Sequence, residues 1–245
     1  NPSLVGSEMC IRDSSESTGV IPFMKVVDAE MLAFSQGVTR RGSYAAYLDI
    51  SHPEVEEFLD VRKPTGGDIN RKSTNLHHGV VVSDKFMQCI ENATRIPGYD
   101  DSWDLIDPHS GEVKNTVSAK TLWVKLIQNR VETGEPYIMF GDTVDEAVPE
   151  FQRELGLKVH QSNLCSEITL PTDKDRTAVC CLSSVNLEEY DEWKDNDQFI
   201  PDLIRMLDNV IEYFITSAPD QLSRAKYSAM SCLLYTSDAA DDGLS

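Results

Sequence analysis

The sequence has little that would place the protein in a membrane or on a nucleic acid. No apolar run approaches the roughly 20 residues that a membrane-spanning helix needs, and the first residues lack the basic and apolar parts of a signal peptide. Lys and Arg number only 22 among 245 residues, against 41 Asp and Glu, which gives a formal net charge of −19. Because such a field repels polyanions, the sequence predicts neither a nucleic-acid partner nor a membrane partner.

Cysteine is also sparse, with six residues and none spaced as Cys-x-x-Cys. This count excludes a disulfide scaffold and gives no support to a zinc ribbon or a thioredoxin-type site, so we predict a reducing, cytoplasmic setting. His77, His78 and His109 invite a metal interpretation, but no carboxylate or further histidine stands at ligand spacing beside them. We therefore predict no metal site and place these histidines at the surface or at strand ends.

The middle of the chain alternates between strand-like and helix-like segments. The strand-like segments are residues 45–50, 79–82 and 136–140. The helix-like segments begin near Asp28, Pro53, Asp84, Ser118 and Ile200. Residues 95–115 are polar and contain several Pro and Gly, which predicts a surface loop. Strands that alternate with helices indicate βαβ units, so the sequence predicts an α/β fold with a largely parallel sheet or barrel.

The two ends of the chain differ from the middle. Residues 1–14 and 231–245 show neither helical nor strand periodicity, and both resemble translated sequencing-adapter sequence. We predict that they are non-native flanks of a body over residues 15–230. The alternative is a pair of native frayed termini. Cys10 and Cys232 lie in these flanks.

One short segment carries the chemistry. Residues 162–168 (SNLCSEI) place an amide, a thiol and a carboxylate at alternate positions, Asn163, Cys165 and Glu167. In an extended loop these three side chains would project to the same side. A thiol suits one-electron chemistry or nucleophilic attack, a carboxylate accepts a proton, and an amide holds a hydroxyl by hydrogen bonds. The spacing alone, however, favours a buried structural cysteine between two surface polar groups over a catalytic thiol.

The same segment resembles the finger-loop motif of the large, catalytic subunit of ribonucleotide reductase. Further stretches fit that family in order along residues 15–230. They are residues 20–24 (VIPFM), 35–37 with Arg40 and Gly42, 52–60 (HPEVEEFLD), 132–137 (ETGEPY) and 178–187 (AVCCLSSVNL). The resemblance implies part of a ten-stranded α/β barrel with a central finger loop, of which about half would be present. It also implies an internal fragment of a class I-like ribonucleoside-diphosphate reductase.

The resemblance implies a role for each residue of the motif. In the family, a radical passed to the finger-loop cysteine removes the hydrogen from the ribose 3′ carbon, a role that falls to Cys165. Glu167 takes the place of the base on the 3′ hydroxyl, and Asn163 that of the amide that positions the reacting groups. Ser162, Asn163 and Glu167 are thereby expected to contact the ribonucleotide substrate.

A second thiol follows from the resemblance at Cys180, with Cys181 as the alternative. In the family it belongs to a pair that reduces the substrate and becomes a disulfide, and the other member lies upstream of the matched residues. Nucleotide effectors, ATP or deoxynucleotides with magnesium, are implied near residues 15–19, where the end of one effector loop falls. Arg40 is an expected effector residue, and Arg71 and Lys72 in a second loop over residues 66–75 are expected to contact effector or substrate, because guanidinium and ammonium groups bind phosphates.

The partners implied by the resemblance are a metal-containing small (beta) subunit that supplies the radical, a second large subunit in a homodimer, and thioredoxin or glutaredoxin as reductant. No covalently bound cofactor is implied. Two other functions stay open: a relative that uses adenosylcobalamin in place of a small subunit, and a non-catalytic nucleotide-binding protein. The presence of Asn163, Cys165 and Glu167 together argues against the binding protein.

Overall fold

The computed structural model describes residues 18–36 and 40–231, and the side chains of Ser35, Gln36 and Arg40 are outside this description. The chain divides into two compact units. The first unit comprises residues 1–147 and 161–169, and the second comprises residues 148–160 and 170–245. The two predicted flanks lie outside the described residues apart from Ser231, so their origin stays a prediction.

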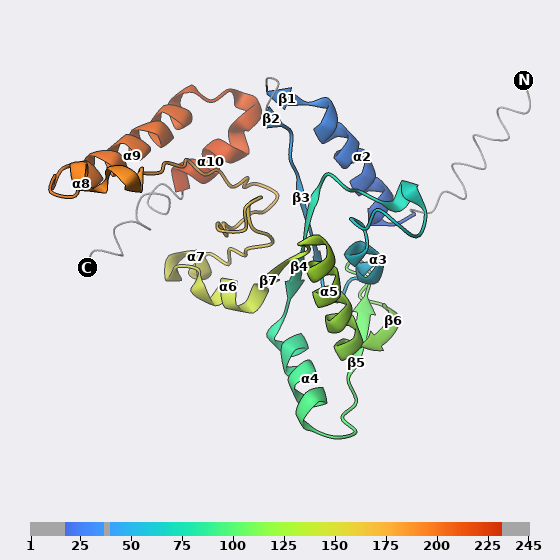
Figure 1. The fold of residues 1–245 in the computed structure, drawn as a ribbon. Helices are drawn as coiled ribbons and strands as arrows, with labels where there is room; N and C mark the ends of the chain where they lie inside the picture. The colour runs from blue at the N-terminus through green and yellow to red at the C-terminus, as the bar shows by residue number, and fades with distance from the viewer. Residues whose placement is uncertain (1–17, 37–39, 232–245) are drawn as a thin grey trace, which may run out of the picture. The chain divides into compact units, whose positions relative to one another are not determined.

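A three-stranded parallel sheet forms the centre of the first unit (Figure 1). Strand β4 (His77–Val82) lies between β3 (Ala45–Asp49) and β7 (Tyr137–Phe140) and is parallel to both. The predicted strands and the predicted parallel sheet are confirmed. The register sets Tyr47, Gly79 and Tyr137 side by side across the three strands. Since successive side chains alternate between faces, this row lies on the face opposite His78, Val80 and Val82.

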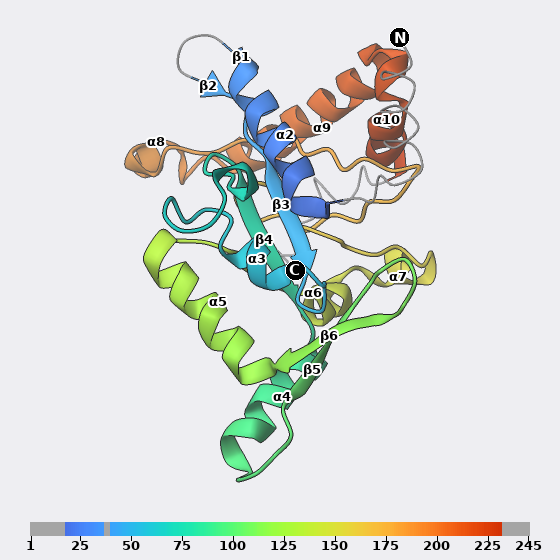
Figure 2. The same cartoon turned by 90° about the vertical axis from the view of Figure 1, so that its right-hand side faces the viewer.

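The second face of the sheet packs against helices. His78, Val80 and Val82 are fully buried, together with Phe58 of α3 (Val55–Leu59). The predicted helices α4 (Asp84–Arg95) and α5 (Ala119–Thr133) contribute Phe86, Leu122 and Leu126 to the same core. In Figure 2, α3 and α5 lie together on one side of the sheet. The opposite face, with Tyr47, Gly79 and Tyr137, is therefore available to contact other parts of the chain.

Helix α5 begins and ends where its sequence signals predict. The Ser118 hydroxyl accepts a hydrogen bond from the Thr121 backbone N–H at 3.1 Å, which satisfies one donor of the first turn. Gly134 ends the helix with φ of 80°, a left-handed conformation that favours glycine.

Replacing Ser118 by alanine is expected to lower the free energy of unfolding by about 1 kcal/mol, because the cap is lost. Urea unfolding followed by tryptophan fluorescence would measure the change. Thr121→Ala is the matched control, since it lies in the exposed first turn of the same helix and leaves the cap intact. Equal stability of Ser118→Ala and Thr121→Ala would contradict the capping role.

Two expectations from the sequence are wrong. Helix α2 spans Val20–Ala33, so it begins before Asp28. The carboxylate of Glu54 accepts a hydrogen bond from the Val20 backbone N–H at 2.8 Å and thus caps this earlier start. Asp28 is buried in the middle of the helix, where it accepts hydrogen bonds from the backbone N–H groups of Asn75 and Leu76 at 3.0 and 2.7 Å. It holds a neighbouring segment and does not cap its own helix.

The predicted loop over residues 95–115 contains most of an antiparallel hairpin of β5 (Ser102–Ile106) and β6 (Val113–Ser118). Trp103 and Leu105 are buried and alternate with exposed neighbours along β5, a pattern that polar composition obscured. The Asp107 carboxylate closes the turn by accepting from the backbone N–H groups of His109 and Ser110. A short turn stabilised in this way allows a polar segment to form strands.

The remaining elements are short, apart from one helix. In the first unit they are β1 (Ser35–Gln36), β2 (Arg40–Arg41), η1 (Ile69–Arg71) and α6 (Gly141–Ala147). The second unit contains α7 (Glu150–Glu154), η2 (Leu187–Glu189), α8 (Tyr190–Trp193), the predicted long helix α9 (Phe199–Ser217), η3 (Asp220–Leu222) and α10 (Ser223–Ser231). Among the described helices, none has the length and apolarity to cross a membrane. The parallel strands described here number three, so a ten-stranded barrel stays a prediction.

Candidate functional site

Residues 161–169 of the first unit form a turn with Cys165 near its tip. The Asn163 carbonyl accepts a hydrogen bond from the Ser166 N–H at 3.2 Å, and the Asn163 N–H donates to the Ile168 carbonyl at 3.0 Å. The Asn163 side-chain oxygen also accepts from the Ile168 N–H at 3.1 Å. Asn163 therefore holds both ends of the turn together, and Cys165 lies between them.

The expectation of an extended backbone in this segment is wrong. Residues 164–166 follow a turn, and Ser166 has φ of 65°, the left-handed region that costs a residue with a side chain about 1 kcal/mol or more. Side chains at alternate positions of such a turn need not project to the same side. The expectation that Asn163, Cys165 and Glu167 share one side therefore does not follow from their spacing. The interpretation as a buried structural cysteine is also wrong, because Cys165 is exposed. Glu167 is exposed and Asn163 is half-buried.

The turn contacts the face of the sheet that carries Tyr47, Gly79 and Tyr137. The Tyr47 hydroxyl lies 2.5 Å from the Ser162 hydroxyl oxygen, and Ser162 is only 6% exposed. Burial, followed by the negative charges of Glu135, Tyr47 and Cys165, raises the pKa of Tyr137. Tyr47 and Tyr137 both pack beside the turn.

A cavity of about 280 Å³ lies between this turn and the sheet. Its lining combines two tyrosines, three hydroxyl side chains from the turn segment and a guanidinium group. The residues that line it include Tyr47, Arg130, Tyr137, Ser162, Ser166 and Thr169. The cavity also has apolar lining from Ile138, Met139, Phe140 and Val144, so the turn borders a hollow of mixed character with one positive charge, and Cys165 is not itself among the lining residues. Such a hollow suits a polar ligand with hydroxyl or phosphate groups.

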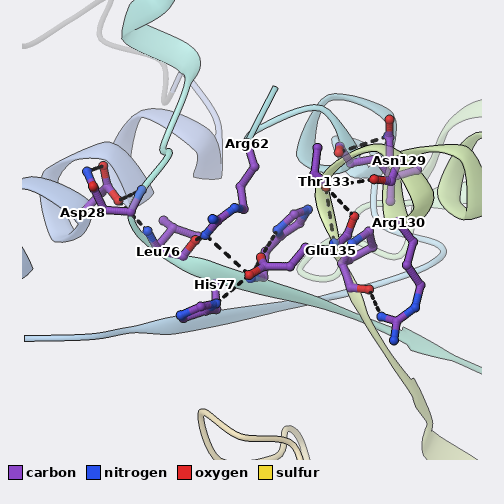
Figure 3. A network of polar contacts seen from close by, with 12 residues as sticks. Asp28, Arg62, Leu76, His77, Asn129, Arg130, Thr133 and Glu135 are labelled. Carbon is purple, nitrogen blue, oxygen red and sulfur yellow. Dashed lines mark hydrogen bonds and ion pairs between the residues drawn. The ribbon is translucent and has the colours of Figure 1, made fainter. Parts of the chain in front are cut away.

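Glu135 is the centre of a polar network at the amino ends of the strands (Figure 3). Its carboxylate lies 2.5 Å from His77 Nδ1 and 2.9 Å from His78 Nδ1, and it accepts from the His78 backbone N–H at 3.0 Å. Because a carboxylate only accepts hydrogen bonds, both imidazoles donate from Nδ1. Arg62 completes the network with an ion pair at 3.4 Å. The His77 ring stacks against Tyr137, which links the network to the site.

The ionisation of Glu135 depends on this network. Burial raises its pKa, but the hydrogen bonds from His78 and His77, the His78 N–H and the charge of Arg62 outweigh burial and lower the pKa to about 2. Glu135 is therefore a carboxylate at neutral pH. No local pattern in the sequence indicates this role, because Glu135 lies 57 and 58 positions away from the histidines. The acidic residue before Pro136 in the ETGEPY stretch is the only signal that the sequence offers.

Cys180 and Cys181 lie in the second unit. Cys180 is exposed, and Cys181 is half-buried in a small apolar pocket. The segment before them is attached to α10 through the buried Arg176. The guanidinium donates to the Ser231 hydroxyl at 2.7 Å and lies 4.8 Å from the centre of the Tyr227 ring. The redox role expected of Cys180 stays a prediction.

The residues predicted to bind an effector contact other parts of the chain. Arg71 forms a bidentate ion pair with Glu57 and donates to the Thr18 carbonyl at 3.2 Å. The hydrogen bonds from Arg71 and its charge lower the pKa of Glu57, and they outweigh burial, which raises it. Lys72 donates to the Asp60 carbonyl at 2.8 Å. The Arg40 side chain lies outside the described part of the chain, as do residues 15–17.

The parallel sheet, with a turn beside it that carries an exposed thiol, defines an α/β protein. Comparison with known proteins identifies the family. The family model for the ribonucleotide reductase barrel domain matches residues 6–230. The chain therefore belongs to the ribonucleotide reductase family, and its α/β fold is that of the family's barrel domain.

Individual relatives agree with this family. The chain is 53% identical to a large-subunit homologue of Frog virus 3 (isolate Goorha) over 84% of its length. It is 46% identical to the ribonucleoside-diphosphate reductase large subunit of Invertebrate iridescent virus 3 over 93% of its length. Among solved structures, the class Id ribonucleotide reductase alpha subunit of Actinobacillus ureae matches 89% of the chain with a TM-score of 0.67 and 31% identity. The chain spans 35%, 44% and 36% of these three proteins, respectively.

Proposed function

We propose that this chain is part of the catalytic subunit of a ribonucleoside-diphosphate reductase, which makes deoxyribonucleotides by thiyl-radical chemistry. One observation carries the proposal: an exposed thiol, Cys165, lies near the tip of a turn closed by Asn163 and is followed two residues later by the exposed carboxylate of Glu167. The names of the large-subunit relatives support a diphosphate substrate. We place the ribose at the cavity beside this turn.

Each residue of the turn has a role in the proposed reaction. The Cys165 thiyl radical takes the hydrogen atom from C3′ and becomes a thiol, while Glu167 takes the proton of the 3′ hydroxyl. The amide of Asn163 and the hydroxyl of Ser162 hold the substrate. With the radical next to it, the 2′ hydroxyl leaves as water. The hydrogen atom later returns from Cys165 to C3′, and the thiyl radical is formed again.

The reduction needs two electrons, and the proposal assigns them to a pair of thiols that includes Cys180. The pair gives up two hydrogens and becomes a disulfide, the ribose loses its 2′ oxygen as water, and the atoms balance. Cys180 is exposed, which supports access by thioredoxin or glutaredoxin for the return to two thiols. Cys181 is the alternative member of the pair.

The wider assembly is part of the same proposal. A metal-containing small subunit would supply the radical, two large subunits would form a homodimer, and residues 15–230 would belong to a ten-stranded barrel. ATP or deoxynucleotide effectors would bind near Arg40, Arg71 and Lys72. Arg71 would then release Glu57 and bind phosphate oxygens, and Lys72 would do the same with the Asp60 carbonyl. Effector binding would therefore compete with contacts inside the chain.

Product formation tests the proposed activity. The whole large subunit, mixed with a radical-generating small subunit, a dithiol reductant and a ribonucleoside diphosphate, is expected to release the deoxyribonucleoside diphosphate. Adenosylcobalamin in place of the small subunit is expected to give no product. Product with adenosylcobalamin alone would contradict the small-subunit requirement, and no product under either condition would contradict the activity.

A single turnover without external reductant tests Cys180. We expect one deoxyribonucleotide and one disulfide that contains Cys180 per active site, measured by thiol titration and peptide mass spectrometry. Cys89, which is half-buried on α4, is the internal control and should stay reduced. A disulfide at Cys181 with Cys180 still reduced would move the role to the alternative residue.

A further inference from the structure

We propose that Tyr47 is a positioning residue of the thiol-bearing turn: through Ser162 it fixes the backbone that carries Cys165. The inference concerns the same site and rests on the proposed function for its catalytic consequence. Neither the sequence motif nor the family match assigns this role to Tyr47. The proposal depends on one close approach in the sheet and on one chain of hydrogen bonds.

The close approach is between Tyr47 and Gly79. The two residues are paired in register on β3 and β4, and the Tyr47 ring lies across the position where another residue would carry its side chain. A Cβ added at Gly79 would lie 2.3 Å from Tyr47 Cε1 and 2.7 Å from two further ring atoms. The ring could not keep its place beside such an atom. Glycine therefore lets the Tyr47 ring lie flat over the middle strand and reach toward the turn.

The chain of hydrogen bonds leads from the sheet to the turn. The Ser162 hydroxyl donates to the Asn163 carbonyl at 2.9 Å, so its single proton is in use and the Tyr47 hydroxyl is the donor in the 2.5 Å contact with Ser162. The same Asn163 carbonyl accepts from the Ser166 N–H. Tyr47, Ser162, Asn163 and Ser166 are thus connected, and Cys165 lies between the last two of them.

The surroundings keep Tyr47 in the form that donates. Burial raises the pKa of Tyr47 and the charge of Glu135 raises it further, while the hydrogen bond with Ser162 acts in the opposite direction and is outweighed. The phenol therefore stays protonated at neutral pH. Ser162, at 6% exposure, has little access to water that could replace the tyrosine hydroxyl. Loss of that hydroxyl would leave a buried group without its donor, so the turn would shift or loosen.

A double-mutant cycle tests the proposal with Tyr47→Phe, Ser162→Ala and the double variant, made in the whole large subunit. The first measurement uses no substrate: the rate of iodoacetamide alkylation at Cys165, followed by peptide mass spectrometry. We expect each single variant to change this rate several-fold and the double variant to match the larger single effect, because both remove the same connection. Independent, multiplying effects on alkylation would overturn the proposal.

The second measurement is steady-state turnover of Tyr47→Phe. We expect kcat to fall about tenfold with KM within about twofold of wild type, as for the loss of one positioning hydrogen bond. Tyr44→Phe, immediately before β3, is the control and should keep wild-type kcat and alkylation. Wild-type kcat and alkylation in Tyr47→Phe would overturn the proposal. If Cys165→Ser kept activity, the proposed function would fail, whereas the alkylation cycle would still decide whether Tyr47 holds the turn.

Discussion

Replacing Cys165 by serine is expected to lower deoxyribonucleotide formation by about 10⁴-fold or more, because the substitution removes the sulfur atom to which the proposed mechanism assigns the radical. An O–H bond is stronger than an S–H bond, so a serine hydroxyl cannot take part in the hydrogen-atom exchange with C3′. The geometry of the turn should survive, since its closing hydrogen bonds come from Asn163, Ser166 and Ile168. Turnover by the whole large subunit with its small subunit would measure the effect.

Two further measurements separate chemistry from misfolding. Substrate affinity of Cys165→Ser, measured by equilibrium binding, should stay within a few-fold of wild type. Cys89→Ser serves as the matched control, because this half-buried thiol lies on α4, where burial raises its pKa and keeps it protonated. The control should turn over at the wild-type rate. Retained product formation in Cys165→Ser would remove the radical role from this residue.

Replacing Glu135 by glutamine is expected to lower the free energy of unfolding by roughly 3 kcal/mol at neutral pH. The value corresponds to the gap between the ordinary pKa of 4.5 and the folded-state pKa of about 2 for this buried carboxylate. The variant leaves the Nδ1 donors of His77 and His78 and the charge of Arg62 facing a neutral amide. Urea unfolding followed by tryptophan fluorescence would give the difference from wild type.

The pH dependence of this difference has a defined sign. Because the folded-state pKa lies below the unfolded one, the contribution of Glu135 is complete above about pH 5 and is lost as the pH falls from 4.5 toward 2. The stability difference between wild type and Glu135→Gln should therefore shrink on acidification. Glu132→Gln is the control: its side chain is 59% exposed and pairs with Lys63, so the expected change is below about 0.5 kcal/mol. A difference that grew at acid pH would contradict the ionised state of Glu135.

Local signals in the sequence account for the elements that were predicted correctly. Helix α5 has a capping serine at Ser118 and a left-handed glycine at Gly134, and β4 and β7 are apolar runs that a buried parallel sheet requires. The start of α2 was missed because Glu54, which caps it, lies 34 positions further along the chain. The hairpin of β5 and β6 was missed because turn residues outnumber its few apolar ones.

The candidate site likewise combines residues that local sequence predicts with contacts between distant positions that it does not predict. Asn163, Cys165 and Glu167 were found because they are close together in sequence and match a family motif. The contacts that surround these residues join positions far apart in the sequence. Glu135 contacts His77 across 58 positions, and no periodicity or spacing predicts such a pairing. The turn conformation at Ser166 also depends on its context, because nothing in a serine itself favours a left-handed backbone.

The contact between Tyr47 and Ser162 joins residues 115 positions apart, and this separation governs when the site is completed during folding. Closing so large a loop costs chain entropy before any compensating contact forms, so the strand with Tyr47 should be in place well before the thiol arrives. A nascent chain that has emerged only as far as residue 147 could already hold the row of Tyr47, Gly79 and Tyr137. Cys165 would not yet have emerged, so the proposed radical chemistry could begin only after residues 161–169 had packed against the sheet.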